Sequence, residues 1–566
     1  MSWIENRSWE GNRMRYRLPV GEDDFAQVRR EYYFVDKSPF IREFMDRHGA
    51  VTLFTRPRRF GKTLMLSMLR YFFDIEHAEE NRQLFNGLAI AEDAEAMREQ
   101  GTRPVVFLTL RELKLTSWDK MEHGLRNVLS ELFRKYCFLL NDAGLDSADR
   151  ENFEQIHAGK ATLVAEMNAL ELLLRLLAKH YGRKAILLLD EYDTPIQQGW
   201  QYGFYDHVIE FMRILLTKAL KTNPALDFAV LTGVLRISKE SIFSDLNNLQ
   251  VDSILSPRYP EAFGFTPAEV AGLAHDFGQQ DKLPELKDWY DGYRFGGKEI
   301  YNPWSVLNYF ANDCEPDTYW VNTSGNAILQ GMLQRATADA WETLQKILQG
   351  KPIRVTVREG FIYSEIYQNK NALYTMLLTT GYLTCQSVRR TDLGQRVELV
   401  LPNRELLALF RIEVLERCHV SHMSTDLEDL MQALLAGEVE AAQKGLAEYI
   451  EVLVSAFDTG AKESFYHGSV LGMTAVLVPD YEVLSNREAG RGRFDVAVFP
   501  KDTTKPGLLF EFKTAASESE LADKADEALQ QMTERDYLAP FRARGVGQVH
   551  QYGVAFCGKQ VLLKKR

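Results

Sequence analysis

Short runs of apolar residues alternate with longer segments of helical periodicity over the first half of the chain. Apolar residues recur at three- and four-residue spacing from Leu163 to Leu177 and over about 205–221, which predicts helices. Strands that alternate with long helices are typical of a three-layer α/β domain, whose parallel sheet binds its ligand at the carboxyl ends of the strands. The apolar runs that predict buried strands lie at residues 51–54, 104–110, 185–189 and 228–231.

The pattern changes after residue 257. Residues 257–310 are rich in proline, glycine, tyrosine and tryptophan, which suits either base stacking or the packing of a helical lid, with packing favoured. A predicted helix at 371–379 precedes two alternating runs that predict a hairpin, so this part is either a winged-helix-like module or a plain interdomain connector. Residues 404–460 predict amphipathic helices. The arginines that would lie near the hairpin tip and contact phosphates are Arg389, Arg390 and Arg396.

The first predicted strand leads into a basic loop and a helix, as a loop that binds nucleotide phosphates requires. Backbone N–H groups around Arg59 and Gly61 would face the phosphates, together with the helix N-terminus. Lys62 would reach the β and γ oxygens, and Thr63 would offer its hydroxyl to Mg²⁺. Arg56 stands where the usual pattern has its first glycine, and a strand-to-helix turn without a ligand stays an alternative.

Two acids at the end of the third apolar run support the phosphate interpretation. Asp190 would bind Mg²⁺ through water and Glu191 would polarise the attacking water; a core strand followed by a polar turn is the alternative. Thr232, at the end of the fourth run, could sense the γ-phosphate. Arg236 could offer its charge to that phosphate in its own chain or in a neighbour, or could form a surface ion pair.

The C-terminal hundred residues predict a second chemical site. Residues 494–499 and 508–513 predict a hairpin that would place Asp495 next to Glu511, with Lys513 on the same strand face as Glu511. Two close carboxylates repel each other unless a cation lies between them, and Mg²⁺ suits a site with few carboxylates and several waters. With the lysine orienting or deprotonating a water, this is a hydrolytic nuclease arrangement; a structural hairpin with a cross-strand ion pair is the alternative.

Further residues could complete this second site. Glu463 could add a third acid, with Glu488 as its rival, and Gln531 on a following helix could close the site by hydrogen bonding. Three arginines precede Asp495 and could hold a nucleic-acid backbone; they are Arg487, Arg491 and Arg493.

Composition limits the remaining choices. The 566 residues suffice for roughly three or four domains. A net charge of -12 argues against a generally basic nucleic-acid coat but leaves room for a local basic channel. The five cysteines form no C-x-x-C pair, and the neighbours Cys418, His419 and His422 predict a helix face rather than a zinc site. We find no apolar run of transmembrane length and no signal core, so we expect a cytoplasmic protein without a membrane partner.

Several motifs together resemble the AAA-ATPase-like proteins of bacteria and archaea. They are TRPRRFGKTL, LLLDEYDTPI, LTGVLRISKESIFSDLNNL, WYDGYRFG and IYNPWSV, followed by YHGSVLG, SNREAGRGRFDVAVF, LLFEFK and ALQQM. The resemblance implies an AAA+-like P-loop NTPase fused to a PD-(D/E)XK nuclease-like domain, and it makes Arg56 a family trait. It also implies ATP and Mg²⁺ as cofactors, with Mn²⁺ as an alternative metal for the nuclease.

The resulting α/β organisation has five parts. These are a leader at 1–17, an AAA+-like P-loop ATPase domain at 18–280, a lid and winged-helix-like module at 281–403, a helical connector at 404–460 and a PD-(D/E)XK nuclease-like domain at 461–566. The leading hypothesis is an ATP-regulated nuclease that cleaves nucleic acid, with DNA favoured over RNA, in defence or mobile-element biology. The alternative is a nucleotide-dependent switch with a non-cutting C-terminal domain that binds nucleic acid or a protein. Both hypotheses leave open whether the chain forms a homo-oligomer.

Overall fold

The computed structural model divides the chain into two compact units, Met1–Tyr319 with Val355–Val397 and Trp320–Arg354 with Glu398–Arg566. We call them the N-terminal unit and the C-terminal unit. The residues that the structure describes are 17–142, 145–237, 243, 247–320, 343, 346–348, 350–357, 369–392, 394–417, 427–456, 466, 470, 473–477, 480–489 and 492–566. No helix among them is long and apolar enough to cross a membrane.

A five-stranded parallel sheet forms the core of the N-terminal unit, as the alternation of strands and helices predicts. Its order is β2-β3-β4-β1-β5, so β4 separates the strand that carries the phosphate loop from the strand that ends in Asp190. All residues of β1 and β3 are buried, which explains why both appear as continuous apolar runs. The strands are β1 (Val51–Thr55), β2 (Val105–Thr109), β3 (Ala185–Asp190), β4 (Leu226–Gly233) and β5 (Leu249–Asp252).

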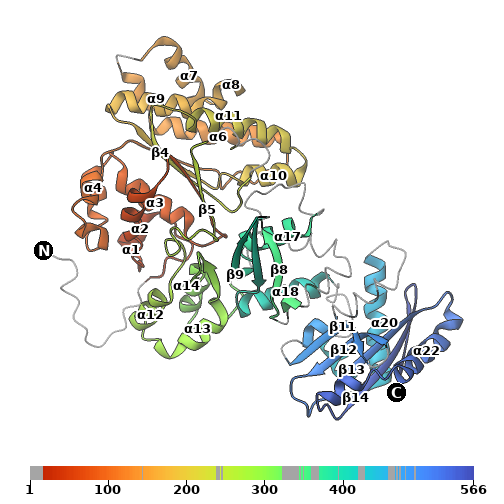
Figure 1. The fold of residues 1–566 in the computed structure, drawn as a ribbon. Helices are drawn as coiled ribbons and strands as arrows, with labels where there is room; N and C mark the ends of the chain where they lie inside the picture. Colours follow the sequence, from red (N-terminus) through yellow and green to blue (C-terminus); the bar gives the residue numbers. More distant parts are fainter. Residues whose placement is uncertain are drawn as a thin grey trace. The chain divides into compact units, whose positions relative to one another are not determined.

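Helices pack against this sheet (Figure 1). The helix after the phosphate loop, α3, contacts β2, β3 and β4, while α9 contacts β3 and β4 and α11 contacts β4. The leucines between 170 and 177 are buried on α9 and belong to the core, whereas Leu163 begins the separate short helix α8 (Leu163–Met167) and is half-buried. The main helices are α1 (Phe25–Glu31), α2 (Pro39–Arg47), α3 (Lys62–Phe73), α6 (Trp118–Lys135), α7 (Ser147–His157), α9 (Ala169–Tyr181), α10 (Thr194–Tyr202) and α11 (Tyr205–Leu220).

The aromatic-rich segment after residue 257 is packed, in line with the favoured interpretation. Tyr290, Tyr309 and Phe310 are buried in one apolar cluster, and the rings of Tyr290 and Tyr309 meet edge to face at 5.6 Å. Aromatic edge-to-face contacts add to the energy of burial. The elements here are α12 (Pro267–Asp276), α13 (Leu283–Tyr290), the hairpin β6 (Tyr293–Phe295) and β7 (Lys298–Ile300), and α14 (Pro303–Ala311).

The helix and hairpin predicted between 368 and 402 are both present. They are α17 (Lys370–Thr380), β9 (Thr384–Thr391) and β10 (Gly394–Val400). With β8 (Ile353–Val357) the hairpin forms a three-stranded sheet of order β8-β10-β9, in which β9 is an edge strand.

A second five-stranded sheet, of order β11-β12-β13-β14-β15, organises the C-terminal unit. β13 and β14 are parallel, and the other neighbours are antiparallel. Helix α22 (Leu521–Glu534) lies so close to β14 that a side chain at Gly553 would come within 2.3 Å of the Ala525 carbonyl oxygen. The strands are β11 (Tyr481–Ala489), β12 (Gly492–Pro500), β13 (Gly507–Thr514), β14 (Val549–Cys557) and β15 (Gln560–Lys565).

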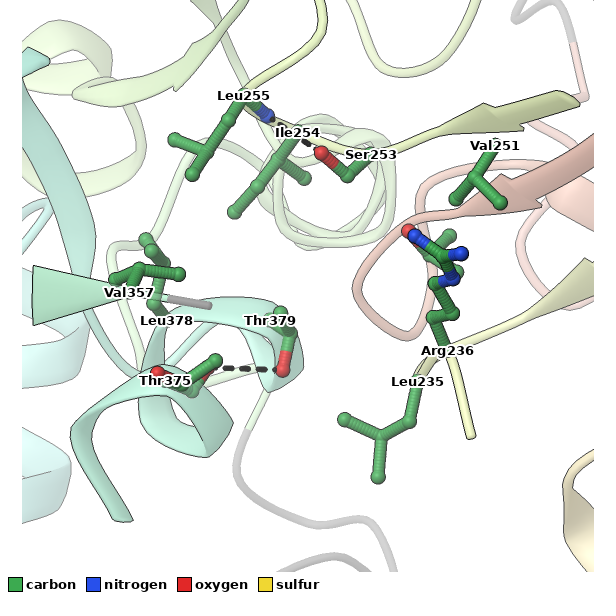
Figure 2. A pocket seen from close by; sticks show the side chains of 11 residues that line it. Leu235, Arg236, Val251, Ser253, Ile254, Leu255, Val357, Thr375, Leu378 and Thr379 are labelled. Atoms are coloured by element: carbon green, nitrogen blue, oxygen red, sulfur yellow. Dashed lines mark hydrogen bonds between the residues drawn. The ribbon is translucent and has the colours of Figure 1, made fainter. Parts of the chain in front are cut away.

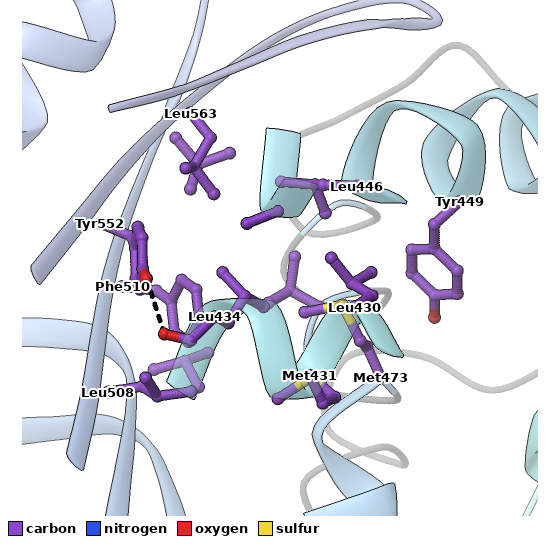
Figure 3. Packing of buried hydrophobic residues seen from close by; sticks show 14 of the residues in the cluster. Leu430, Met431, Leu434, Leu446, Tyr449, Met473, Leu508, Phe510, Tyr552 and Leu563 are labelled. Atoms are coloured by element: carbon purple, nitrogen blue, oxygen red, sulfur yellow. Dashed lines mark hydrogen bonds between the residues drawn. The ribbon is translucent and has the colours of Figure 1, made fainter. Parts of the chain in front are cut away.

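Helices from the segment predicted as a connector share the core of this sheet. Leu430 and Leu434 of α19 (Leu427–Ala436) pack with Leu508 and Phe510 (Figure 3). Gln443 of α20 (Val439–Ala456) covers the sheet edge: its amide donates to Val561 O at 2.9 Å and accepts from Leu563 N at 2.6 Å. The side chain thus pairs backbone groups that an edge strand otherwise exposes. Helix α18 (Arg404–Arg417) precedes them.

Some sequence predictions fall outside the described residues. These are the leader up to residue 16, Glu463, the Cys418–His419–His422 neighbours, Arg491, most of the helix predicted from Lys462, and the side chains of Arg487 and Glu488.

Candidate functional sites

The loop between β1 and α3 has the conformation of a tight, strained turn. Gly61 begins α3 with φ +81°, and Arg59 has φ +67°, which is unfavourable for a residue with a side chain. Lys62 is buried, and its ammonium donates to Arg56 O at 3.1 Å and Pro57 O at 2.8 Å. The Lys62 ammonium therefore lies against the carbonyl groups of its own loop, within reach of a phosphate that binds to the loop.

Arg56, the residue at the unusual position, is buried inside the protein. Its guanidinium donates to Asp252 O at 2.7 Å and Tyr259 O at 3.4 Å. It also lies over the Phe263 ring at 5.0 Å and the Phe295 ring at 5.4 Å. Burial lowers the pKa of Arg56 to about 10, opposed by Asp252. The side chain ties the loop to the end of β5, which glycine could not do.

We therefore expect Arg56→Gly to destabilise the protein, although it restores the usual sequence pattern. The change leaves a cavity and removes donors from buried carbonyls, at a cost on the order of 3 kcal/mol. Thermal unfolding of the N-terminal unit should show a clearly lower midpoint. Arg58→Gly is the matched control, because Arg58 is only half-buried and contacts Gln197 at 3.2 Å. An Arg56→Gly midpoint equal to or above that of the parent would contradict this account.

Aromatic residues from the middle of the chain pack against the phosphate loop. Phe60 lies 5.0 Å from both Tyr293 and Phe295, measured between ring centroids. The Arg59 guanidinium stacks on Trp304 at 3.6 Å. Three of the motifs that suggested the family resemblance, TRPRRFGKTL, WYDGYRFG and IYNPWSV, thus pack together in the N-terminal unit.

Asp190, at the end of β3, is the centre of a hydroxyl network. It accepts hydrogen bonds from Thr63 Oγ1 at 2.8 Å, Thr232 Oγ1 at 2.6 Å and Thr109 Oγ1 at 3.4 Å. Burial raises the pKa of Asp190. The predicted residues Thr63, Asp190 and Thr232 therefore meet at one point, and their oxygens suit Mg²⁺. Sequence reasoning missed Thr109, although its place at a predicted strand end was a signal.

Glu191 follows in a strained backbone conformation, with φ +52°. Its carboxylate accepts from Thr194 Oγ1 at 3.0 Å. Burial lowers the pKa of Lys62, and the charges of Glu191, Asp190 and Asp193 oppose this effect. The structure thus places the loop lysine and the predicted acids in one electrostatic neighbourhood.

Asp193 and Tyr192 hold the segment that follows β4, and sequence reasoning gave neither a role. Asp193 Oδ2 accepts from Val234 N at 2.8 Å and from Leu235 N at 2.9 Å. The Tyr192 hydroxyl donates to Leu235 O at 2.6 Å and accepts from Ile237 N at 3.2 Å. Burial raises the pKa of Asp193. These contacts fix the backbone on either side of residue 236.

Arg236 itself lines a small cavity of about 30 Å³ on the β5 side of the sheet, together with Thr55, Val251 and residues of α17 (Figure 2). Lys62 and Asp190 are not part of that lining. A basic residue that sequence reasoning missed is Arg111, two residues beyond Thr109 and ion-paired with Asp23. The position of Arg111 directly after a predicted strand could have indicated that it lies near the candidate site.

The predicted carboxylate pair of the C-terminal unit is present. Val496 pairs with Phe510 on antiparallel strands, which sets Asp495 opposite Glu511. Asp495 Oδ2 accepts from Phe512 N at 2.7 Å, and Lys513 Nζ lies 3.7 Å from Glu511 Oε1. Burial raises the pKa of Glu511 to about 8, and the nearby charge of Asp495 adds to the rise.

Gln531 closes this group from helix α22, as predicted. Its amide oxygen accepts from Lys513 Nζ at 2.7 Å, and its amide nitrogen donates to Glu511 and, at 3.2 Å, to the Tyr537 hydroxyl. Sequence reasoning missed Tyr537. These contacts involve Oε1 of Glu511. The other carboxylate oxygen, Oε2, is buried and has no hydrogen-bond partner among the described residues.

A divalent metal ion fits this arrangement. A buried carboxylate oxygen without a partner is costly, and a cation between Asp495 and Glu511 would satisfy it and relieve their repulsion. The part of the chain that the structure describes contains no group of three or more histidine, cysteine or acidic residues that could hold a metal. Two carboxylates supplemented by water suit Mg²⁺ or Mn²⁺ rather than Zn²⁺.

Two family models match this chain. Residues 19–243 match a family described as a predicted AAA-ATPase, and residues 461–566 match the PD-(D/E)XK nuclease superfamily. The chain joins an AAA-ATPase-like domain to a PD-(D/E)XK nuclease superfamily domain. The chain is 27% identical over 561 residues to an "Uncharacterized protein in vnfD 5'region" of Azotobacter chroococcum mcd 1, and the match covers 96% of each chain. No solved structure matches it.

Proposed function

We propose that this protein binds and hydrolyses ATP and that its nucleotide state regulates Mg²⁺-dependent cleavage of nucleic-acid phosphodiester bonds. The observation that carries the proposal is the group formed by Asp495, Glu511, Lys513 and Gln531, with one buried carboxylate oxygen left for a metal. A purely structural ion pair has no need of a second acid opposite the first.

In the nucleotide half, Lys62 would exchange the loop carbonyls that it now contacts for β- and γ-phosphate oxygens. Thr63 and Asp190 would hold Mg²⁺, since their oxygens already lie 2.8 Å apart. Glu191 would polarise the attacking water, and Thr232, bonded to Asp190, would sense the γ-phosphate through that contact. Arg59 and Gly61 would supply backbone N–H groups, as predicted from the sequence.

Arg236 keeps its proposed role toward phosphate in trans. It lines the small cavity rather than the surroundings of Lys62, so a neighbouring chain of a homo-oligomer is the more suitable recipient of its charge.

In the nuclease half, Asp495 and Glu511 would hold the metal, with Glu463 as the proposed third acid. The metal, when bound, would supply Lewis acidity toward the phosphate and a lower pKa for its water. Lys513 would orient that water as an ammonium, or take its proton as the neutral amine. Gln531 holds the Lys513 ammonium beside Glu511. This contact restricts the lysine to one of the many rotamers that a long side chain can adopt.

The proposal also includes a cellular setting. We propose a cytoplasmic protein whose substrate is DNA rather than RNA, acting in defence or mobile-element biology. The nucleotide state would change the segment that packs on the phosphate loop and so regulate the nuclease site in the C-terminal unit. The direct test is incubation of plasmid, linear DNA and RNA with Mg²⁺ or Mn²⁺, with and without ATP. Metal-dependent cleavage that changes with ATP supports the proposal. Metal binding without cleavage of any substrate would instead favour the non-cutting switch.

The raised pKa of Glu511 predicts an unusual pH dependence for the metal-free protein. An ordinary glutamate has a pKa near 4.5, against about 8 here, so the folded state binds the extra proton. Stability from this group is therefore fully present below pH 4.5 and is lost as the pH rises through 8. In EDTA, Glu511→Gln should remove this loss, so the variant should melt above the parent at pH 8 and nearer to it at pH 5.

The matched control is Glu518→Gln, since Glu518 is exposed in the same unit. Its melting curves should follow those of the parent at every pH. A constant difference between Glu511→Gln and the parent across pH would contradict the assignment.

A further inference from the structure

The β9–β10 hairpin carries a segment that leaves the protein body. In a strand that lies on a core, alternate residues are buried. In β9, Thr384 and Cys385 are buried, but every residue from 386 to 391 is exposed. Both faces of this part of the strand therefore face solvent. We call residues 386–392 and 394–396 the arm.

The arm is basic in a chain that is acidic overall. It contains Arg389, Arg390 and Arg396 against the single acid Asp392, whereas the whole chain has a net charge of -12. All three arginines are exposed, and none of them forms an ion pair within the described part of the chain. Because strand side chains alternate, Arg389 and Arg390 project from opposite faces. The arm can thus present positive charge on two sides.

The base of the arm rests on the phosphate loop. Gly381, between α17 and β9, has φ +92°, and a side chain there would come within 2.8 Å of Pro57. Tyr293, which also packs on Phe60, donates to Gly381 O at 3.1 Å. The arm is thus anchored in the ATPase half of the protein, and it lies outside the nuclease domain.

We propose that the arm is a contact surface for the sugar–phosphate backbone of duplex DNA. Arginine guanidinium groups match phosphate oxygens in geometry as well as in charge. An arm only one hairpin wide, with charge on both faces, suits a groove between two phosphate strands. The proposal rests on nucleic acid as the substrate, but not on cleavage, so the two can fail separately.

A second explanation of the same arginines is protective. Charged residues on an edge strand prevent pairing with another chain. The two explanations differ in their response to the sign of the charge. Glutamate would protect the edge as well as arginine does, but it would repel phosphate.

The test measures binding of the full-length protein to a short fluorescent duplex in EDTA, by anisotropy over a series of NaCl concentrations. We expect Arg389→Glu with Arg390→Glu to weaken binding on the order of 100-fold at 0.1 M salt, and the two alanine changes to reduce the slope of log affinity against log salt by about 2. The control is Lys218→Glu with Lys221→Glu, which changes the charge equally at exposed residues of the same unit. It should bind nearly as the parent does.

Unchanged affinity and salt slope in the arm variants, with parental melting curves, would overturn the proposal. So would parental DNA binding combined with a changed oligomeric state on gel filtration, since the arm would then contact a second copy of the chain. Lys524→Ala should bind the duplex as the parent does, because it changes a surface residue of α22 and leaves the arm intact. Binding lost in the arm variants alone supports the proposal even if no variant cleaves DNA.

Discussion

Lys513→Ala should lower the rate of DNA cleavage by on the order of 10²–10⁴-fold, the usual effect of removing a positioned proton-transfer group, while ATP hydrolysis stays at the parental rate. Lys513 Nζ is held 2.7 Å from Gln531 Oε1 and 3.7 Å from Glu511 Oε1, so its position is set by two contacts. No other described lysine shares this place. The measurement is the initial rate of plasmid nicking with saturating Mg²⁺, in parallel with phosphate release from ATP.

Two companion variants sharpen this result. Asp495→Ala should lose cleavage as well, and its Mg²⁺ dependence should shift to higher concentration, because it removes a metal ligand. Lys524→Ala is the matched control: this lysine also lies on the C-terminal unit but pairs with Glu527 at 2.7 Å on the surface of α22. Parental cleavage by both Lys513→Ala and Asp495→Ala would refute the nuclease assignment.

Lys62→Ala should weaken ATP binding on the order of 100-fold, corresponding to about 3 kcal/mol, because it removes a charged donor to the phosphates. ATP hydrolysis should fall at least as far. The side chain is buried, so its replacement also removes a positive charge that interacts with Asp190, Glu191 and Asp193. Fluorescent ATP titration gives the affinity, and a melting curve with and without ATP separates loss of binding from loss of folding.

Lys184→Ala provides the comparison, since Lys184 is exposed just before β3 in the same domain. Its ATP affinity should equal that of the parent. If Lys62→Ala is folded and still gains stability from ATP to the parental extent, the loop does not bind the nucleotide. The same variant should then be examined for nuclease activity, because regulated cleavage predicts that ATP no longer changes its rate.

Local sequence patterns indicated the main residues of both candidate sites. Continuous apolar runs predicted β1 and β3 because these strands are buried on both faces. A spacing of two residues puts Glu511 and Lys513 on one face of a strand, and a short hairpin leaves almost no freedom in where Asp495 can lie. Short strands with mixed residues, such as β5, gave no comparable signal.

The local sequence pattern could not predict contacts between residues that are far apart in the chain. Nothing near Arg56 reveals that its charge is buried against carbonyls of Asp252 and Tyr259, roughly 200 residues away. The packing of α19 and α20 against the C-terminal sheet could not be predicted either. The amphipathic pattern of a helix shows that one face is buried, but it does not show which element covers that face. The sequence by itself determined strand faces, loop type and the paired acids, since these depend on neighbours in the chain. Only the folded structure decided what supports them, since burial and long-range hydrogen bonds depend on the whole packing.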